Sequence, residues 1–217
     1  MARRSLPRGL YAITDSHLIP ADTLTDQVAA AIRGGAALIQ YRDKLSSPEQ
    51  RQQQAAALVP LCHDHGIALI INDDIELAAT VGADGVHLGK ADSTLRSARK
   101  RLGAKAIIGV SCYNEFERAV EAASEGADYV AFGRFFPSQS KPDAVAADPE
   151  LLRQAGQRLS MPVVAIGGIT PENGAPLITA GAQLLAAIHG VFGQADTEAA
   201  ARRYAELFTA YRDETEC

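Results

Sequence analysis

The stretch LIINDDIELAATVGADGVHLGKAD, residues 69–92, decides the fold predicted for this chain. Its apolar start at 69–71 is too short for a helix and stops at Asn-Asp-Asp (72–74), as a buried parallel strand does at its carboxyl end. A short segment of helical composition follows and ends at Gly82, the residue type that most easily adopts the left-handed conformation beyond a helix. A second apolar run begins at Gly85, so the stretch predicts two neighbouring parallel strands joined by a short helix.

Carboxylates follow both predicted strands. Asp73 and Asp74 come directly after the first strand, and Asp92 follows the second. The carboxyl ends of parallel neighbours meet at one edge of a sheet, where carboxylates repel one another unless a cation lies between them. Mg²⁺ held by one or two carboxylates and by the phosphates of a substrate is the usual arrangement. We therefore predict a magnesium site with Asp73 and Asp92 as its protein ligands. We also expect one of the two adjacent aspartates to cap the following helix while the other faces the cleft.

Length and composition describe an ordinary globular protein. With 217 residues, 47% hydrophobic and 22% charged, the chain predicts one α/β domain over 1–217, with a short N-terminal tail at about 1–8. The net charge of −5 gives no electrostatic footprint for nucleic acid, and no apolar run suits a membrane span or a signal peptide. Three widely spaced cysteines without a CxxC pair indicate a reducing cytoplasm, rather than a disulfide framework or a zinc site.

A short motif recurs four times as glycine, turn and apolar run: GGAALI from Gly34, GADGV from Gly82, GADYV from Gly126 and GAQLL from Gly181. Such helix-to-strand joints are typical of stacked βα units with a parallel sheet. The candidate strands are residues 9–14, 38–41, 69–72, 86–88, 106–111, 129–133, 163–167 and 184–188. The helical patterns include 25–33, 48–63, 76–81, 93–102, 115–124, 149–159, 171–180 and 197–211. This alternation predicts a single-domain (β/α)₈ barrel. A doubly wound open sheet is the alternative, and the lack of GxGxxG after the first strand disfavours it.

In such a barrel the loops at the carboxyl ends of the strands carry the function. The second strand ends in Gln40, Arg42 and Lys44, which period-two alternation points the same way, and this predicts a phosphate clamp rather than a surface turn of mixed charge. After the fifth strand, Ser111 either binds a phosphate or caps the next helix. Cys112 has no neighbouring histidine in the sequence to activate it and is predicted to be a bystander.

The loops after the last three strands predict further contacts with anions. The segment 134–149 is the longest irregular stretch, and its Ser138, Ser140 and Lys141 predict a loop that closes over an anionic substrate. A solvated surface loop is the alternative. The glycines at 167–168 and the backbone at 188–189 predict a cup for a monophosphate, since these barrels commonly bind phosphate after strands seven and eight.

The predicted site has no clear pair of nucleophile and base. His87 lies within the fourth strand and either lines the pocket, which we favour, or packs inside the barrel, whereas His17 lies in a loop without an evident partner. The predicted site residues fit a reaction that needs only the negative charge of a leaving group to be neutralised. In such a reaction pyrophosphate departs from carbon and leaves a carbocation, which a second substrate then attacks. The residues thus predict a metal-dependent barrel that acts on phosphate esters.

Seven sequence blocks resemble those of the thiamine-phosphate synthase family and occur in its order: LYAITD (10–15), QYRDK (40–44), INDD (71–74), GADGVHLGKAD (82–92), IGVSCY (108–113), GADYVAFGRFFPSQSK (126–141) and VVAIGGIT (163–170). QYRDK and INDD are the specific blocks, because other phosphate-binding barrels share GGIT. The resemblance implies a (β/α)₈ transferase, a thiamine-phosphate diphosphorylase. Its reaction joins 4-amino-2-methyl-5-hydroxymethylpyrimidine diphosphate to 4-methyl-5-(2-hydroxyethyl)thiazole phosphate, giving thiamine phosphate and pyrophosphate. It further implies Mg²⁺, a dissociative step through a pyrimidine methylene cation and small-molecule substrates in the cytoplasm, and it leaves a homo-oligomer open.

The resemblance also implies roles for individual residues. Asp73 and Asp92 match the magnesium ligands of the family. The pyrimidine-diphosphate contacts that it implies are Gln40, Arg42, Lys44, Asn72, Ser111 and Lys141, of which Arg42, Ser111 and Lys141 are expected to be catalytic. The thiazole-phosphate contacts that it implies are Ser138, Ser140, Gly168, Ile188 and His189. The chain departs from the family's pattern at His189, where a serine is common, and at Arg134, where a smaller residue is common.

Three other functions compete with this hypothesis. A thiazole tautomerase resembles the synthase in fold and in the monophosphate cup but does not need the diphosphate clamp. A non-catalytic barrel would bind thiamine phosphates and regulate, and Mg²⁺-dependent turnover of both substrates distinguishes the synthase from it. A Schiff-base aldolase would use Lys44 or Lys141 and would be trapped by borohydride with a carbonyl substrate.

Overall fold

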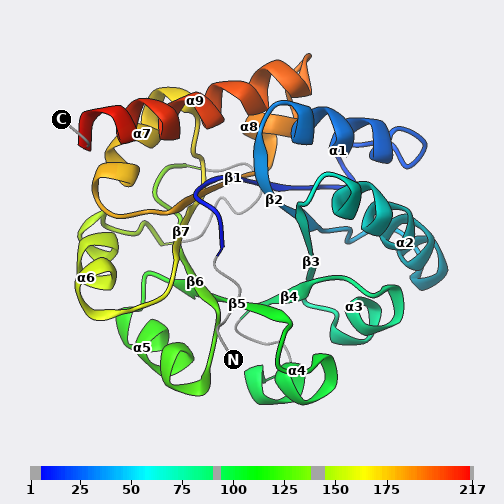
Figure 1. The fold of residues 1–217 in the computed structure, drawn as a ribbon, viewed down its shortest axis with the longest axis horizontal. Helices are drawn as coiled ribbons and strands as arrows, with labels where there is room; N and C mark the ends of the chain where they lie inside the picture. Colours follow the sequence, from blue (N-terminus) through cyan, green and yellow to red (C-terminus); the bar gives the residue numbers. More distant parts are fainter. Residues whose placement is uncertain (1–5, 90–93, 138–144, 216–217) are drawn as a thin grey trace.

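The predicted strands form a closed parallel barrel in the computed structural model, which describes residues 6–89, 94–137 and 145–215, the segment 211–215 by its backbone alone. The strands follow one another round the barrel in chain order, and the last pairs with the first (Figure 1). Their bounds are β1 Gly9–Ile13, β2 Ala36–Tyr41, β3 Ala68–Asn72, β4 Gly85–Leu88, β5 Ile107–Tyr113, β6 Tyr129–Phe132, β7 Val163–Ile166 and β8 Leu184–Ala187. The (β/α)₈ prediction is confirmed, and the open doubly wound sheet is wrong.

Helices surround the barrel as an outer ring (Figure 1). Their bounds are α1 Leu24–Arg33, α2 Pro48–Asp64, α3 Ile75–Val81, α4 Leu95–Leu102, α5 Phe116–Glu125, α6 Glu150–Arg158, α7 Pro171–Thr179, α8 His189–Phe192 and α9 Thr197–Thr215. The last of them, α9, lies across the outside of α1 and α7 and also packs against β1. It therefore covers the seam where β8 meets β1.

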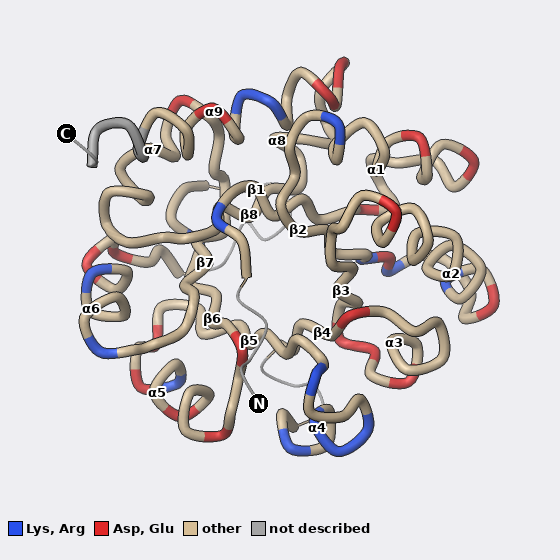
Figure 2. The backbone as a smooth tube through the Cα atoms, in the orientation of Figure 1, with Lys and Arg blue, Asp and Glu red and all other residues tan. Residues whose placement is uncertain are grey.

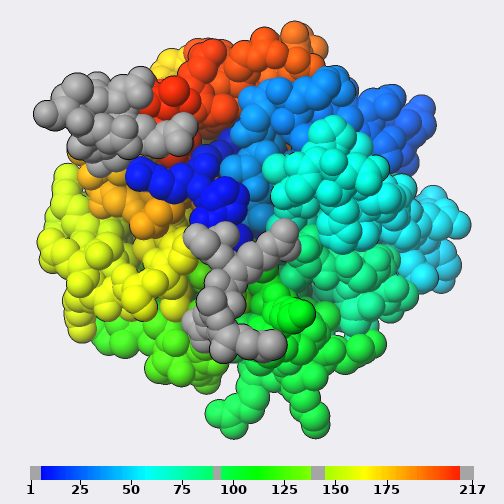
Figure 3. Space-filling view, viewed as in Figure 1, coloured from blue at the N-terminus to red at the C-terminus, as the bar shows by residue number. Residues whose placement is uncertain are grey.

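Alternation along the strands divides the apolar core into two parts. Tyr11 and Ile13 belong to a buried set inside the barrel, whereas Leu10 and Ala12 belong to the larger set between the strands and the helices. Leu6, which falls within the predicted tail, is buried with the inner set. The first described residues of the chain, coloured dark blue, lie close to the centre of the face shown in Figure 3. Side chains thus fill the barrel, which is a packed core and not a pore.

Charged residues lie mainly on the outer ring. Lys and Arg gather on α4, while Asp and Glu are spread over several other helices (Figure 2). Among the described residues, no helix is long and apolar enough to cross a membrane.

The stretch 69–92 folds as predicted over its described part. β3 and β4 pair in parallel, with Asn72 opposite His87. Between them, Asp74 is the N-cap of α3 and accepts a hydrogen bond of 2.9 Å from the backbone N–H of Leu77, and Gly82 ends the helix in the left-handed conformation. Of the two adjacent aspartates, Asp74 is therefore the cap, which leaves Asp73 at the carboxyl end of β3 for another role.

Candidate active site

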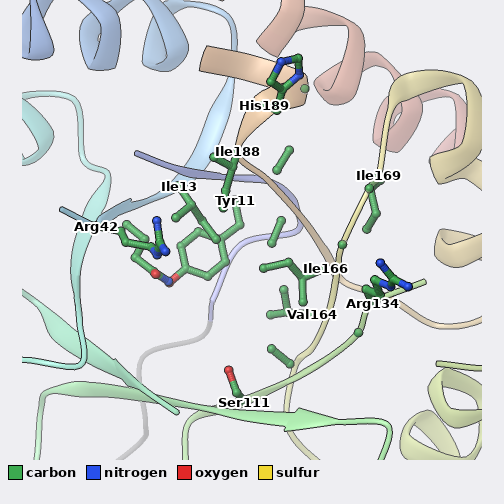
Figure 4. Close-up of a pocket in the computed structure, with 18 of the residues that line it drawn as sticks. Tyr11, Ile13, Arg42, Ser111, Arg134, Val164, Ile166, Ile169, Ile188 and His189 are labelled. Carbon is green, nitrogen blue, oxygen red and sulfur yellow. The ribbon is translucent and has the colours of Figure 1, made fainter. Parts of the chain in front are cut away.

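A cavity of about 330 Å³ lies at the carboxyl ends of the strands (Figure 4). Its walls are mainly apolar, with Val164 and Ile166 from β7 and Ile188 after β8. Seven of the predicted site residues line it: Gln40, Arg42, Asn72, Ser111, Gly168, Ile188 and His189. These residues lie near the carboxyl ends of five different strands, so the closed barrel brings distant parts of the sequence to one cavity. His87 lines it as well, and it is also buried inside the barrel, so both interpretations of this histidine hold.

Other predicted residues lie beside this cavity or outside the described residues. Lys44 and Asp73 contact each other next to Asn72, which lines the cavity. The structure does not describe four residues predicted for the site: Asp92, Ser138, Ser140 and Lys141.

Arg42 is held by groups from the end of β1. The Thr14 hydroxyl accepts a hydrogen bond of 2.8 Å from the backbone N–H of Arg42 and donates one of 3.1 Å to its carbonyl oxygen. The guanidinium donates through Nη1 to Oδ2 of Asp15 at 2.6 Å. Such an ion pair fixes the direction of the guanidinium before any ligand binds.

Asp15 is the partner of Arg42, a contact that the sequence did not reveal. The prediction that His17 has no evident partner is wrong, because its ring Nδ1 lies 2.9 Å from Oδ1 of Asp15. Burial raises the pKa of Asp15, but hydrogen bonds from the backbone and the ring of His17, with the charge of Arg42, outweigh it and lower this pKa below its ordinary value. The carboxylate is therefore held in its charged form.

Asp73 has an uncommon backbone conformation for a residue other than glycine, with φ at 63°. Its backbone N–H donates to the carbonyl oxygen of His87 at 2.9 Å, which extends the pairing of β3 with β4 by one residue. Its Oδ2 accepts hydrogen bonds of 2.6 Å from Lys44 Nζ and 2.6 Å from Asn72 Nδ2. Backbone strain of this kind gathers at functional sites, so the geometry favours a binding role for this carboxylate.

The three side chains of the predicted phosphate clamp, Gln40, Arg42 and Lys44, each contact a different partner. Gln40 bonds to Tyr11 inside the barrel, Arg42 reaches Asp15 after β1, and Lys44 reaches Asp73 after β3. Alternation applies only up to Tyr41, where β2 ends. Beyond that point the loop sets the direction of each side chain, and the two cations flank the rim instead of forming one row.

The floor of the cavity carries a polar chain that was also not foreseen. Tyr11, Tyr129 and His87 are buried and hydrogen-bonded in succession, and they connect Gln40 at one end to Ser111 at the other. The tyrosines look like core aromatics in the sequence, and only the closed barrel brings β1, β4 and β6 together here.

The loop after β7 contains two glycines with positive φ, 104° at Gly167 and 63° at Gly168. A Cβ atom at Gly168 would overlap the carbonyl oxygen of Pro137, and one at Gly167 would overlap Arg134. We predicted that these glycines let a ligand approach the backbone. The structure adds that the lack of side chains at these glycines lets the segment after β6 pack against them. In this contact the N–H of Phe136 donates to the carbonyl oxygen of Gly167 at 3.0 Å.

Arg134 borders the cavity on the side opposite Arg42, so two guanidinium groups flank it (Figure 4). His189 lines the cavity at the start of α8. Cys112 is buried, and burial raises the pKa of its thiol to about 12, which supports its interpretation as a bystander.

The described donors suit a hard divalent cation. Asp73 offers carboxylate oxygen at the rim, and Mg²⁺ takes one or two carboxylates together with phosphate oxygens. No group of three or more His, Cys, Asp or Glu side chains with metal-binding geometry occurs among residues 6–89, 94–137 and 145–215. This geometry disfavours an all-protein metal cage in the described part and is compatible with an ion shared with a substrate.

Arginines on both sides of the cavity, a lysine and a carboxylate at its rim, and glycine-rich backbone after β7 are groups that bind phosphates and their counter-ions. Fold and site together define the class: a phosphate-binding (β/α)₈-barrel enzyme.

Comparison with known proteins identifies the family within this class. The profile described as thiamine monophosphate synthase matches residues 10–191. The thiamine-phosphate synthase of Nitrosococcus oceani is 54% identical over 94% of each chain, and that of Alcanivorax borkumensis is 52% identical over 94% of this chain and 95% of its own. The thiamine phosphate pyrophosphorylase of Pyrococcus furiosus superimposes with a TM-score of 0.84 at 31% identity, covering 93% of this chain and 96% of that one. The chain belongs to the thiamine monophosphate synthase family, whose members are transferases.

Proposed function

We propose that this chain joins 4-amino-2-methyl-5-hydroxymethylpyrimidine diphosphate to 4-methyl-5-(2-hydroxyethyl)thiazole phosphate, with Mg²⁺ as cofactor. Thiamine-phosphate synthase activity follows from its membership of the family. The observation that carries the substrate assignment is the group at the ends of β2 and β3, where Lys44 and Asn72 donate to the Asp73 carboxylate and Arg42, like Asn72, lines the cavity. A diphosphate with its metal ion is the ligand that this mixture of charges suits best.

The diphosphate is the leaving group, and its departure needs stabilised negative charge. Arg42 and Lys44 offer N–H donors from two sides of the rim. Asp73 would hold Mg²⁺ together with Asp92 and the diphosphate, and when bound the ion neutralises charge that develops on the leaving oxygen. Lys141 completes this set, and Ser111 is the further catalytic residue that we assign to the pyrimidine diphosphate. Lys44 forms an ion pair with Asp73, which disfavours the aldolase that would use it as a nucleophile.

The bond changes require no base from the protein. The C–O bond to the diphosphate breaks with both electrons going to oxygen, and the methylene cation accepts the lone pair of the thiazole nitrogen to form the C–N bond. A cation of this kind reacts with water if water is present. The apolar walls formed by Val164, Ile166 and Ile188 support its survival, because apolar side chains offer no hydrogen-bond partner that would hold water next to the cation.

The second substrate needs a subsite for its monophosphate. Gly168 and the backbone at Ile188 and His189 line the side of the cavity that faces the β7 and β8 loops. Backbone N–H groups at a helix start favour an anion. Ser138 and Ser140 are the further contacts that we assign to this phosphate, and Arg134 adds positive charge from the same side.

The reaction is assigned to the cytoplasm. The two described cysteines, Cys62 and Cys112, are free thiols buried in the core, which is typical of a reducing compartment.

The test is an assay of pyrophosphate release with both substrates, with and without Mg²⁺. We expect release only when both substrates and the metal ion are present. Asp73→Ala should lower kcat by at least about 100-fold, and Asp74→Ala, which removes the neighbouring cap, should retain most of the activity. Equal losses in the two variants would contradict a metal role for Asp73. Binding of both substrates without turnover would indicate the regulatory barrel instead.

A further inference from the structure

Four hydrogen bonds cross the floor of the cavity in an unbroken series. Gln40 Nε2 donates to the hydroxyl of Tyr11 at 2.7 Å, and the hydroxyls of Tyr11 and Tyr129 are 2.8 Å apart. The Tyr129 hydroxyl lies 2.9 Å from His87 Nδ1, and His87 Nε2 lies 2.8 Å from Ser111 Oγ. The series connects β2 to β5 through β1, β6 and β4. We call these five residues the relay.

The three inner residues of the relay are buried. Tyr129 is 0% exposed, Tyr11 1% and His87 8%. Burial raises the pKa of both tyrosines, so each keeps its hydroxyl proton. The His87 ring stacks on Tyr129 with centroids 5.5 Å apart, and Tyr11 meets Tyr129 edge-on, which fixes the rings in place. A buried hydroxyl held in this way must donate its one proton to a neighbour in the relay.

With the Gln40 amide nitrogen as the donor at one end, this constraint sets the direction of every bond. The Tyr11 hydroxyl accepts from Gln40, so it donates to Tyr129, its other partner among the described residues. Tyr129 then donates to His87 Nδ1, which must be the unprotonated nitrogen. His87 therefore carries its proton on Nε2 and donates to Ser111 Oγ.

The two ends of the relay are thereby fixed as opposites. Ser111 already accepts from His87, so its own O–H is available to a ligand in the cavity that it lines, and Figure 4 shows this side chain pointing inward from β5. Gln40 uses its nitrogen on Tyr11, which leaves its amide oxygen as the acceptor. One end of the floor donates, and the other accepts.

We propose that His87, Tyr129 and Tyr11 are positioning residues that hold Ser111 as a hydrogen-bond donor and the Gln40 amide oxygen as an acceptor toward the aminopyrimidine ring. The inference rests on the proposed function. An aminopyrimidine carries an exocyclic amino donor and ring nitrogens that accept, which is the pattern complementary to this floor. As long as the His87 imidazole carries a single proton, reversing any bond of the relay requires reversing all four, because each hydroxyl and the imidazole then have one proton to donate. The recognition at the two ends is therefore coupled through the buried residues.

The tautomer of His87 tests the direction of the relay without any substrate. We expect the ¹⁵N chemical shifts of the whole protein, labelled at histidine, to give a protonated Nε2 and an unprotonated Nδ1 for His87, with His87→Gln used to assign the signals. In Tyr129→Phe, Nδ1 loses its donor, and the two tautomers should mix. The matched control is Tyr41→Phe, which removes the hydroxyl of another buried tyrosine, one that donates to Gln54 at 2.6 Å outside the relay. It should leave the His87 signals unchanged.

Kinetics test the positioning role. Tyr129→Phe should raise the KM for the pyrimidine diphosphate about tenfold with a smaller effect on kcat, and it should leave the KM for the thiazole phosphate unchanged. If Tyr129→Phe does not fold, Tyr11→Phe serves: it should raise the same KM, since Gln40 loses its partner, and should keep the His87 tautomer.

A proton on Nδ1 of His87 in the wild type would overturn the relay whatever the activity of the enzyme. An unchanged pyrimidine KM in the folded Tyr129→Phe or Tyr11→Phe variant would overturn its role in recognition. Lack of pyrophosphate release by the wild type with both substrates and Mg²⁺ would instead overturn the proposed function, so the failures are distinguishable.

Discussion

Two buried aspartates, Asp15 and Asp43, support the segment that carries Arg42 and Lys44. Asp15 binds the guanidinium of Arg42 directly. Asp43 accepts hydrogen bonds from the backbone N–H groups of Leu45 at 2.8 Å and Ser46 at 3.0 Å, and so forms the turn that follows. Both carboxylates act through their neighbours, and each role gives a measurable consequence.

Replacing Asp15 should weaken the function of Arg42 without removing Arg42 itself. We expect Asp15→Ala to lower kcat/KM by about tenfold, since the guanidinium loses the partner that orients it. Asp15→Asn should lose less, because its amide oxygen still accepts from Nη1. Steady-state kinetics of both variants, with Asp26→Asn in the exposed first turn of α1 as control, would check this. Equal losses in the Ala and Asn variants would contradict an orienting role.

Asp43 should make stability depend on pH in the acid range. Burial raises its pKa, but hydrogen bonds from the Ser46 side chain and from the Leu45 and Ser46 backbone outweigh this and lower it to about 2. A lowered pKa stabilises the fold above the unfolded value near 4, and this contribution is lost as the pH falls toward 2. We expect wild type to exceed Asp43→Asn by about 2 kcal/mol in free energy of unfolding at pH 6 and the difference to disappear near pH 2. Urea denaturation of both proteins across this range measures it, and a constant difference would refute it.

Chain position alone was enough to predict that certain residues lie at the cavity, whereas their roles stay predictions. Gln40, Arg42, Asn72 and Ser111 lie within two residues of the carboxyl ends of their strands, and all line the cavity. Asp15 occupies the same kind of position, but its contact depends on a partner 27 residues away, just beyond the end of the neighbouring strand. A pairing of that kind arises from tertiary structure and leaves no local pattern in the sequence.

Among the elements, the loop after β7 and the segment after β6 form one wall of the cavity. Gly168 has φ at 63°, and a side chain there would strike the backbone of Phe136 and Pro137. The wall thus depends on a position where both backbone conformation and space exclude a Cβ atom.

Gly168→Ala should therefore destabilise the protein by about 1–3 kcal/mol and raise the KM for the thiazole phosphate, because the segment after β6 must move away. Gly156→Ala is the control: Gly156 lies in α6 with open space around its Cβ position, and this change should stabilise by up to about 1 kcal/mol. Thermal unfolding and substrate kinetics of the two variants give the comparison. A neutral Gly168→Ala would show that the wall adapts at little cost.

Element boundaries were predictable because apolar runs and helix-ending glycines mark them. The eight strands occur where the apolar runs predicted them, with ends shifted by one or two residues. The shift at the carboxyl end of β5, which reaches Tyr113 and not Ser111, has a local cause: the pairing with β6 is irregular between these residues, and Tyr113 has φ at 55°. A bulge adds a residue without changing composition, so hydrophobic periodicity does not reveal it.

At the scale of the whole molecule, the closed barrel follows from repeated βα units of similar length, which the sequence displays. The way the C-terminal helix supports the site does not follow from them. The Tyr204 hydroxyl in α9 is buried and donates to the carbonyl oxygen of Ile169 at 2.7 Å, and Ile169 lines the cavity. Gly190 has no side chain, and a Cβ atom there would overlap this hydroxyl. The last helix, α9, thus supports the loops after β7 and β8 from the outer side of the barrel.

Tyr204→Phe should lower the free energy of unfolding by about 1–2 kcal/mol, because it leaves a buried carbonyl oxygen without its donor. It should also raise the KM for the thiazole phosphate a few-fold while leaving the KM for the pyrimidine diphosphate unchanged, since Ile169 lies on the β7 side of the cavity. This is the reverse of the pattern expected for Tyr129→Phe in the relay. Unfolding in urea and kinetics with each substrate varied in turn would measure both effects. If Tyr204→Phe changed both KM values equally, α9 would support the barrel as a whole rather than one subsite, and the division of the cavity into two ends would have to be abandoned.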